Sequence, residues 1–119
     1  MIKIAPSILS ADYASLGSAV DVLADWGADY VHLDVMDGAF VPNITFGAPM
    51  TKALRPHTEL VFDAHLMVEN PSKWVQPFKE AGADIVTIHV EADKHAHRTL
   101  QLIRSLGMKA GIALNPATP

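Results

Sequence analysis

Short apolar runs rich in β-branched residues alternate with amphipathic stretches along the chain, and a glycine follows most of the amphipathic stretches. An apolar run of about four to eight residues is typical of a buried strand, and an apolar repeat of about 3.6 residues is typical of a helix. We therefore expect repeated strand–helix units, and strands joined through helices run parallel. The predicted strands extend from Ile2 to Leu9, from Tyr30 to Met36, from Leu60 to Val68, from Ile85 to Val90 and from Lys109 to Leu114.

Four helices are expected between these strands. Leu16 and Val20 belong to an apolar stripe with helical spacing, and Gly27 can end that helix in a left-handed cap. Asn70 and Pro71 form an N-cap followed by proline at the first helical position. The expected helices extend from Leu16 to Ala24, from Ala48 to Leu54, from Pro71 to about Ala81 and from about Lys94 to Leu106.

An internal repeat supports this order of elements. Residues 27–35 resemble residues 82–90, and five of the nine aligned positions are identical. Duplication of strand–helix units would leave such a repeat, although buried strands of similar composition can also converge on it. Parallel sheets with covered faces are mainly doubly wound open sheets or (β/α)₈ barrels. Residues 7–12 contain no glycine, so the dinucleotide fingerprint of the open sheet is missing after the first strand.

Alternation along the strands separates an apolar face from a face with histidine and carboxylate side chains. His32 and Asp34 share this face on the second predicted strand, His65 lies on the third, and His89 and Glu91 lie at the end of the fourth. Helices on both faces of an open sheet would bury these groups at a cost of several kcal/mol each unless they were paired. The mouth of a barrel explains them better, so we predict an α/β fold of the (β/α)₈-barrel (TIM-barrel) type.

The pattern predicts a metal site at this edge of the sheet. Two imidazoles and one carboxylate, from His32, Asp34 and His65, suit one divalent ion such as zinc, iron, manganese or cobalt. Asp34 is also a candidate general base, and an ion pair with a histidine is the simpler alternative. Three methionines either line a flexible pocket here or fill the core, namely Met36, Met50 and Met67.

Other polar residues near this edge have two interpretations each. His89 and Glu91 either support the metal ligands from outside or are solvated at the rim. Ser7, at the end of the first predicted strand, either reaches a substrate hydroxyl or caps the following turn. The remaining histidines are expected to be solvated, namely His57, His95 and His97.

Composition narrows the class of protein. Half of the 119 residues are hydrophobic, 18% are charged and the formal net charge is −4, which excludes an intrinsically disordered chain and disfavours nucleic acid or an anionic membrane as a partner. The chain contains no cysteine, which excludes disulfides and thiolate ligands. Neither a signal peptide nor a membrane span is recognisable, so we expect a soluble, cytoplasmic protein that acts on small molecules.

Four motifs resemble the ribulose-phosphate 3-epimerase family. They are APSILSAD at residues 5–12, HLDVMDGAFVPN at 32–43, DAHLMV at 63–68 and GIALNPATP at 111–119. The resemblance covers the whole chain in family order. It implies a (β/α)₈ barrel that interconverts D-ribulose 5-phosphate and D-xylulose 5-phosphate in the pentose phosphate pathway, with residues 1–119 as the N-terminal part of one domain, about five strands and four helices.

The resemblance also implies roles for individual residues. The family's metal ligands fall on His32, Asp34 and His65, and its proton-abstracting aspartate is Asp34. Substrate contacts fall on Ser7 and His65, and two methionines lie near the enediolate, Met36 and Met67. A second catalytic aspartate, also the fourth metal ligand, belongs to the family's seventh strand.

That seventh strand has no counterpart in this sequence, since a (β/α)₈ barrel usually needs about 250 residues. We therefore expect negligible epimerase turnover from these 119 residues alone. Either they are a fragment of a longer chain, which we favour, or half-barrels associate as a homo-oligomer to cover their flanks. Alternative functions are those of a sister sugar-phosphate barrel, such as an allulose-6-phosphate epimerase or a decarboxylase, and of a non-catalytic metal-binding module.

Overall fold

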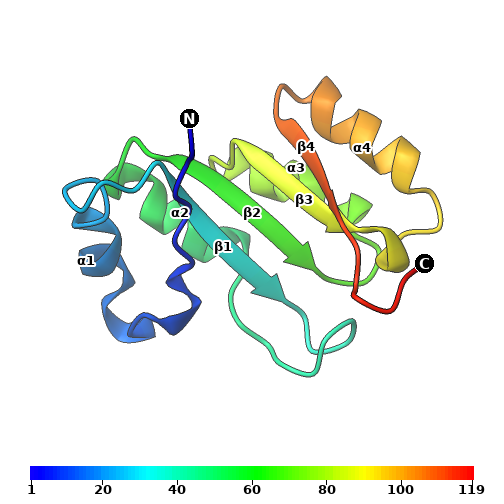
Figure 1. Ribbon diagram of the computed structural model, residues 1–119, viewed down its shortest axis with the longest axis horizontal. Helices are drawn as coiled ribbons and strands as arrows, with labels where there is room; N and C mark the ends of the chain where they lie inside the picture. Colours follow the sequence, from blue (N-terminus) through cyan, green and yellow to red (C-terminus); the bar gives the residue numbers. More distant parts are fainter.

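A parallel sheet of four strands in the order β1-β2-β3-β4 organises the chain in the computed structural model, which describes residues 1–119 (Figure 1). Helices alternate with the strands, and α2 and α3 lie behind the sheet in this view. The predicted α/β class, the first part of a (β/α)₈ barrel, is confirmed. The strands are β1 (Tyr30–Met36), β2 (Val61–Met67), β3 (Ile85–His89) and β4 (Lys109–Ala113), and the helices are α1 (Leu16–Asp21), α2 (Ala48–Leu54), α3 (Ser72–Glu80) and α4 (Ala96–Ser105).

The predicted strand from Ile2 to Leu9 is wrong in its extent. This segment runs beside β1 and accepts hydrogen bonds from it at the carbonyls of Ile4 and Pro6, but its only bridge joins Ser7 to His32. Continued parallel pairing would need an N–H at residue 6, and proline has none. A 3₁₀ helix, Ile8–Ser10, follows at once.

The C-terminal end of α1 and the N-terminal end of α3 differ from the prediction. Helix α1 ends at Asp21, and tighter turns continue to Gly27, whose φ of 88° allows the Ala28 N–H to reach the Leu23 carbonyl. That is the expected glycine cap. Helix α3 begins at Ser72 with Pro71 at the N-cap, so the predicted N-cap at Asn70 is wrong by one residue, and proline offers no side-chain cap. Asn70 precedes the helix in the left-handed region with φ 49°.

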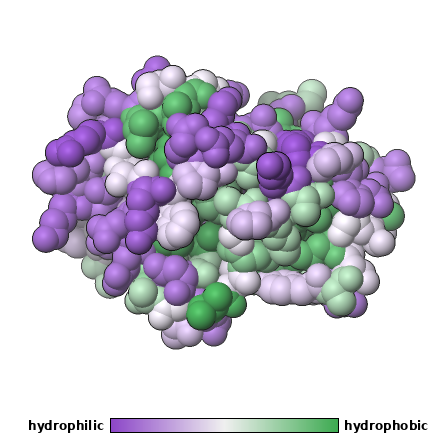
Figure 2. Space-filling model, turned by 180° about the vertical axis from the view of Figure 1, so that it is seen from behind, coloured by the Kyte–Doolittle hydropathy of each residue, from purple (hydrophilic) through white to green (hydrophobic).

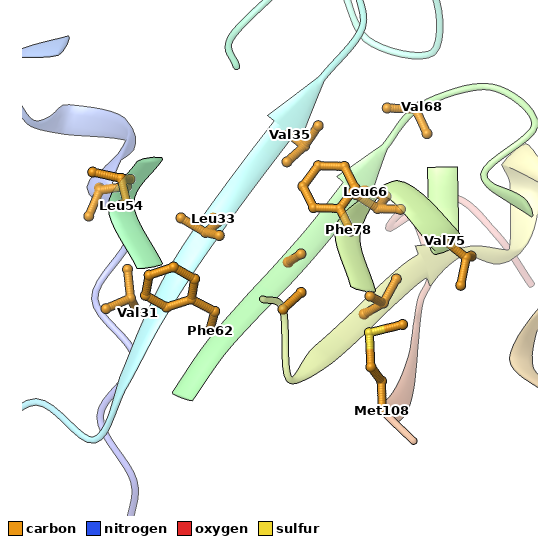
Figure 3. Packing of buried hydrophobic residues seen from close by; sticks show 14 of the residues in the cluster. Val31, Leu33, Val35, Leu54, Phe62, Leu66, Val68, Val75, Phe78 and Met108 are labelled. Carbon is orange, nitrogen blue, oxygen red and sulfur yellow. The ribbon is translucent and has the colours of Figure 1, made fainter. Parts of the chain in front are cut away.

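The apolar face of the sheet forms the core, as the alternation predicted. Val31, Leu33 and Val35 of β1 are buried, as are the alternate residues of β2 and β3 (Figure 3). Phe78 of α3 and Leu54 of α2 pack against them. Burial of one such side chain stabilises the fold by about 1.5–3 kcal/mol, so this face holds the strands in one register and directs the polar face away from the helices.

Arg55, at the C-terminal end of α2, makes hydrogen bonds with the segments that precede β2 and β3. Its guanidinium donates hydrogen bonds to the carbonyls of Thr58, Leu60 and Gly82 at 2.8, 2.6 and 3.0 Å. It also lies 3.7 Å from the centre of the Phe62 ring. Because one side chain joins the segments before β2 and β3, it fixes the relative position of these two strands.

The surface of the protein includes exposed apolar areas. The face seen from behind is mostly hydrophilic with an apolar area near its middle (Figure 2). Large apolar side chains are exposed at both lateral edges of the sheet, including Ile2, Ile4, Ile112 and Leu114. No helix combines the length and the apolar character needed to cross a membrane.

Candidate metal centre and active site

The polar face of β1 and β2 brings the predicted residues together. The strand register places Asp34 opposite His65 and His32 opposite Asp63. Alternation puts all four side chains on the face that carries no helices. The hydrophobic core therefore positions this cluster, because a register shift by one residue would turn every polar side chain into the core.

His32, Asp34 and His65 form a compact group of donor atoms. Each offers one nitrogen or oxygen within 4.8 Å of the other two. Oδ1 of Asp34 lies 3.2 Å from Nε2 of His32 and 3.3 Å from Nδ1 of His65. The three side chains are 15–24% exposed, so the group is accessible to a small ion or substrate while largely shielded from water.

Asp63 sets the orientation of the His32 ring. Its Oδ2 lies 2.9 Å from Nδ1 of His32, and a carboxylate can only accept, so Nδ1 carries the proton. In the neutral ring Nε2 then has a free lone pair, and this atom faces Asp34. A ring with its far nitrogen bound to a carboxylate is the usual arrangement of a metal-ligating histidine. The donor set therefore fits a divalent cation.

The two histidines of the cluster have opposite pKa shifts. The hydrogen bond to Asp63 raises the pKa of His32, and nearby Asp34 adds to this against the effect of burial. Burial lowers the pKa of His65, and the adjacent His89 lowers it further. His65 is thus the ring that more readily stays neutral, as a metal ligand must be.

Ser7 caps the following turn, as one of its two interpretations predicted, and it also contacts Asp34. Its hydroxyl donates a hydrogen bond to Oδ2 of Asp34 and accepts one from the Leu9 backbone N–H at 3.1 Å. The serine therefore caps the turn after the N-terminal segment and also contacts the candidate base. The bridge between Ser7 and His32 fixes this approach.

His89 and Glu91 continue the cluster toward β4. Nε2 of His89 lies 2.8 Å from Nε2 of His65, and its Nδ1 lies 3.3 Å from Oε1 of Glu91. Glu91 also accepts hydrogen bonds from the Asn115 N–H at 2.7 Å and from the Thr118 hydroxyl. The solvated alternative for His89 is wrong, because the residue is 7% exposed.

The methionines separate into two groups. Met36 and Met67 end β1 and β2 and face each other in the register, on the same side as Asp34 and His65. Met50 instead packs against the hydrophobic core from α2, so for it the pocket interpretation is wrong. The three remaining histidines, His57, His95 and His97, are exposed, as expected.

Two residues that shape the site were missed by the sequence analysis. Asp63 entered the sequence analysis only as the first residue of the motif at 63–68, and its pairing with His32 depends on the register between strands. Thr45 closes the loop after β1, because its hydroxyl donates to the Asp34 carbonyl at 2.8 Å and accepts from the Met36 N–H at 3.0 Å. No motif marked Thr45, since the contact depends on how the loop folds back.

Comparison with known proteins gives a consistent result. The family described as "Ribulose-phosphate 3 epimerase family" matches residues 3–119. "Ribulose-phosphate 3-epimerase" of Bacillus subtilis (strain 168) is 56% identical over 119 residues, 100% of this chain and 55% of that protein. The Rhodobacter capsulatus protein of the same name is 55% identical over 118 residues, 99% of this chain and 52% of its own. The chain thus spans about half the length of these curated relatives.

Proposed function

The chain belongs to the ribulose-phosphate 3-epimerase family, and we propose that it supplies the metal-binding and proton-abstracting half of such an epimerase. The proposed reaction interconverts D-ribulose 5-phosphate and D-xylulose 5-phosphate by removing and returning the proton at C3. The observation that carries the proposal is the position of Asp34, whose Oδ1 lies within 3.3 Å of a nitrogen of both His32 and His65.

In this proposal Asp34 is the base that takes the C3 proton. A proton next to a ketone is acidic enough for a carboxylate only when the developing enediolate is stabilised. A divalent ion, when bound by His32, Asp34 and His65, supplies that stabilisation as a Lewis acid. The metal would be zinc, iron, manganese or cobalt, since these suit two imidazoles and a carboxylate.

The other site residues orient and shield the reacting carbons. Ser7 holds Oδ2 of Asp34 and is placed to contact a substrate hydroxyl. Met36 and Met67 present flexible apolar side chains beside the base, which would exclude water from the enediolate. His65 is proposed to contact substrate as well as metal.

Inversion at C3 needs a second acid on the opposite side of the enediolate. We propose that the rest of a longer protein supplies it, together with the phosphate-binding loops, and that the 119 residues alone have negligible turnover. Ile112 in β4 and Leu114 directly after it are exposed, which supports this proposal, because further strands would cover them. A homo-oligomer of half-barrels is the alternative, and the reading frame after Pro119 distinguishes the two.

The decisive experiment assays the protein as its gene encodes it. Purified protein with Zn²⁺, Mn²⁺, Fe²⁺ or Co²⁺ is expected to convert ribulose 5-phosphate to xylulose 5-phosphate and to exchange the C3 proton with solvent deuterium. Asp34→Asn should abolish both, whereas Asp25→Asn, the same change at an exposed aspartate, should abolish neither. Exchange that persists in Asp34→Asn would contradict the assignment of the base.

Two alternatives have their own signatures in that assay. A preference for allulose 6-phosphate over ribulose 5-phosphate would identify a sister epimerase. Stoichiometric metal binding without turnover or exchange would identify a metal-binding module. We propose the cytoplasm as the location, in keeping with a freely diffusing sugar-phosphate substrate.

A further inference from the structure

Phe40 lies at the end of a row of aromatic rings that crosses the polar face of the sheet. The ring centres of His32 and His65 are 5.5 Å apart, and those of His65 and His89 are 4.9 Å apart. The Phe40 ring follows at 5.1 Å from His89. The three histidines belong to β1, β2 and β3, whereas Phe40 belongs to the loop after β1. Phe40 therefore bounds the candidate active site on the side of β3.

The carboxylate of Asp37 holds Phe40 in this position. Its Oδ1 accepts hydrogen bonds from the N–H groups of Ala39 and Phe40, and its Oδ2 accepts one from the N–H of Glu69, all at 2.9 Å. Asp37 directly follows β1 and Glu69 lies two residues after β2, so the backbone of Phe40 is tied to the ends of both strands. The hydroxyl of Thr45 ties the other end of the loop to β1. Phe40 is thus a fixed wall of the site.

A hollow of about 430 Å³ adjoins Phe40. Phe40 and Glu91 line this hollow, and both also contact His89, Phe40 with its ring and Glu91 by a hydrogen bond to Nδ1. His89 itself does not line the hollow, so these two side chains separate it from the row of histidines. A water molecule occupies about 30 Å³ in the liquid, so the hollow has room for a further carbon and its hydroxyl. The Phe40 ring, rather than dense packing behind it, limits the space on this side.

The place of β3 in the barrel decides which end of a sugar phosphate Phe40 would face. Phosphate sites of (β/α)₈ barrels frequently lie after the seventh and eighth strands, which the proposed function assigns to the rest of a longer protein. With the N-terminal segment beside β1 as the first strand, β3 is the fourth, and the fourth of eight strands lies opposite the eighth. A substrate held there by its phosphate directs its ketone end toward β3 and Phe40.

Resting on the function proposed above, we propose that Phe40 is a specificity-determining residue that limits the substrate to a single carbon beyond the ketone. Ribulose 5-phosphate has one such carbon, C1, with its hydroxyl. A ketose with two carbons beyond the ketone would meet the Phe40 ring, whose backbone is held by Asp37. The apolar ring also offers no hydrogen bond to the additional hydroxyl, which would lose water without gaining a partner.

Two hexulose phosphates test the size and the direction of this limit in the protein as its gene encodes it. The compound arabino-hex-3-ulose 6-phosphate matches ribulose 5-phosphate from the ketone to the phosphate and has one more carbon beyond the ketone. Allulose 6-phosphate has its additional carbon between the ketone and the phosphate. Phe40→Ala should raise kcat/KM for the hex-3-ulose, relative to ribulose 5-phosphate, about 10–200-fold, the range for one carbon in a pocket. The ratio for allulose 6-phosphate should not change.

Phe46→Ala is the matched control, because Phe46 lies in the same loop but its ring contacts Tyr13, with the ring centres 5.6 Å apart. Both ratios should keep their wild-type values in this variant. Each ratio comes from one preparation, so a partial loss of folded protein cancels. Phe40→Leu keeps a larger apolar side chain than alanine and should raise the hex-3-ulose ratio in the same direction by a smaller factor.

The possible results distinguish the role of Phe40 from the proposed function. A wild type that converts ribulose 5-phosphate, with unchanged ratios in Phe40→Ala and Phe40→Leu, would refute the role of Phe40 alone. An equal rise for both hexulose phosphates would overturn the assignment of Phe40 to the ketone end. A wild type that turns over none of the three sugar phosphates would refute the proposed function and, with it, this role.

Discussion

Asp34 and His65 are register partners on β1 and β2, and their facing atoms, Oδ1 and Nδ1, lie 3.3 Å apart. His32 adds Nε2 at 3.2 Å from the same oxygen. Three acceptor-capable atoms thus converge on one small volume, which is favourable only when a proton or a cation lies among them. The cluster is therefore stabilised by added positive charge, either from protonation of His32 or from a bound metal ion.

Replacing Asp34 with asparagine tests the cation and the base together. Asp34→Asn keeps the size of the side chain but removes the negative charge at the centre of the cluster. In the protein as its gene encodes it, we expect a loss of at least about 10²–10⁴-fold in kcat, the usual value of general base catalysis. Divalent-metal binding should weaken in calorimetry, and metal should no longer raise the midpoint of thermal unfolding. Wild-type affinity in this variant would mean that the ion binds elsewhere.

Replacing Asp63 with asparagine tests the support of the His32 ring. The hydrogen bond to Asp63 is the main cause that raises the pKa of His32, so in Asp63→Asn this pKa should fall. Histidine NMR titration of the metal-free protein measures the change directly. Metal affinity should also drop about 10–100-fold. An unchanged His32 titration would show that Asp34 alone sets the charge of this ring.

The sequence predicts the residues of the candidate site better than it predicts the neighbouring residues that hold them in position. Strict alternation in β1 and β2 places His32, Asp34 and His65 on one face from sequence alone, because only one orientation of each strand buries its apolar residues. The partnership of His32 with Asp63 depends on the register between two strands, which no local pattern contains. The strand predicted from Ile2 to Leu9 is too long, because Pro6 interrupts the pairing of a segment that is otherwise apolar and strand-like.

Acid unfolding should reveal the environment of Glu91. Its pKa is lowered from 4.5 to about 2 in the folded protein, first by the Thr118 hydroxyl and then by the Asn115 N–H. A lowered folded-state pKa stabilises the protein above the unfolded value and loses that effect as pH falls through the folded value. Urea unfolding should therefore show a wild-type advantage over Glu91→Gln at neutral pH that shrinks between pH 4.5 and about 2. A wild-type advantage in unfolding free energy that stays constant over this pH range would contradict the lowered pKa of Glu91 in the folded protein.

Gly82 and Arg55 make the most specific prediction about stability. Gly82 has φ 101°, and a Cβ there would lie 2.8 Å from Cγ of Arg55 and closer still to Cδ. The Arg55 side chain is held by its hydrogen bonds and cannot easily move away. Gly27 is the matched control, because its φ is 88° and a Cβ added there would meet no atom within 4 Å.

Gly27→Ala should cost about 1–2 kcal/mol, the penalty of a left-handed conformation for a residue with a side chain. Gly82→Ala should cost about 1–3 kcal/mol more, because it adds overpacking against Arg55. In an Arg55→Ala background this additional cost should disappear, since the neighbouring side chain is gone. Free energies of unfolding from urea titrations of these variants measure the coupling. Equal costs for the two glycines in the wild-type background would show that Arg55 can yield, and that the start of the sheet is less firmly held than its contacts indicate.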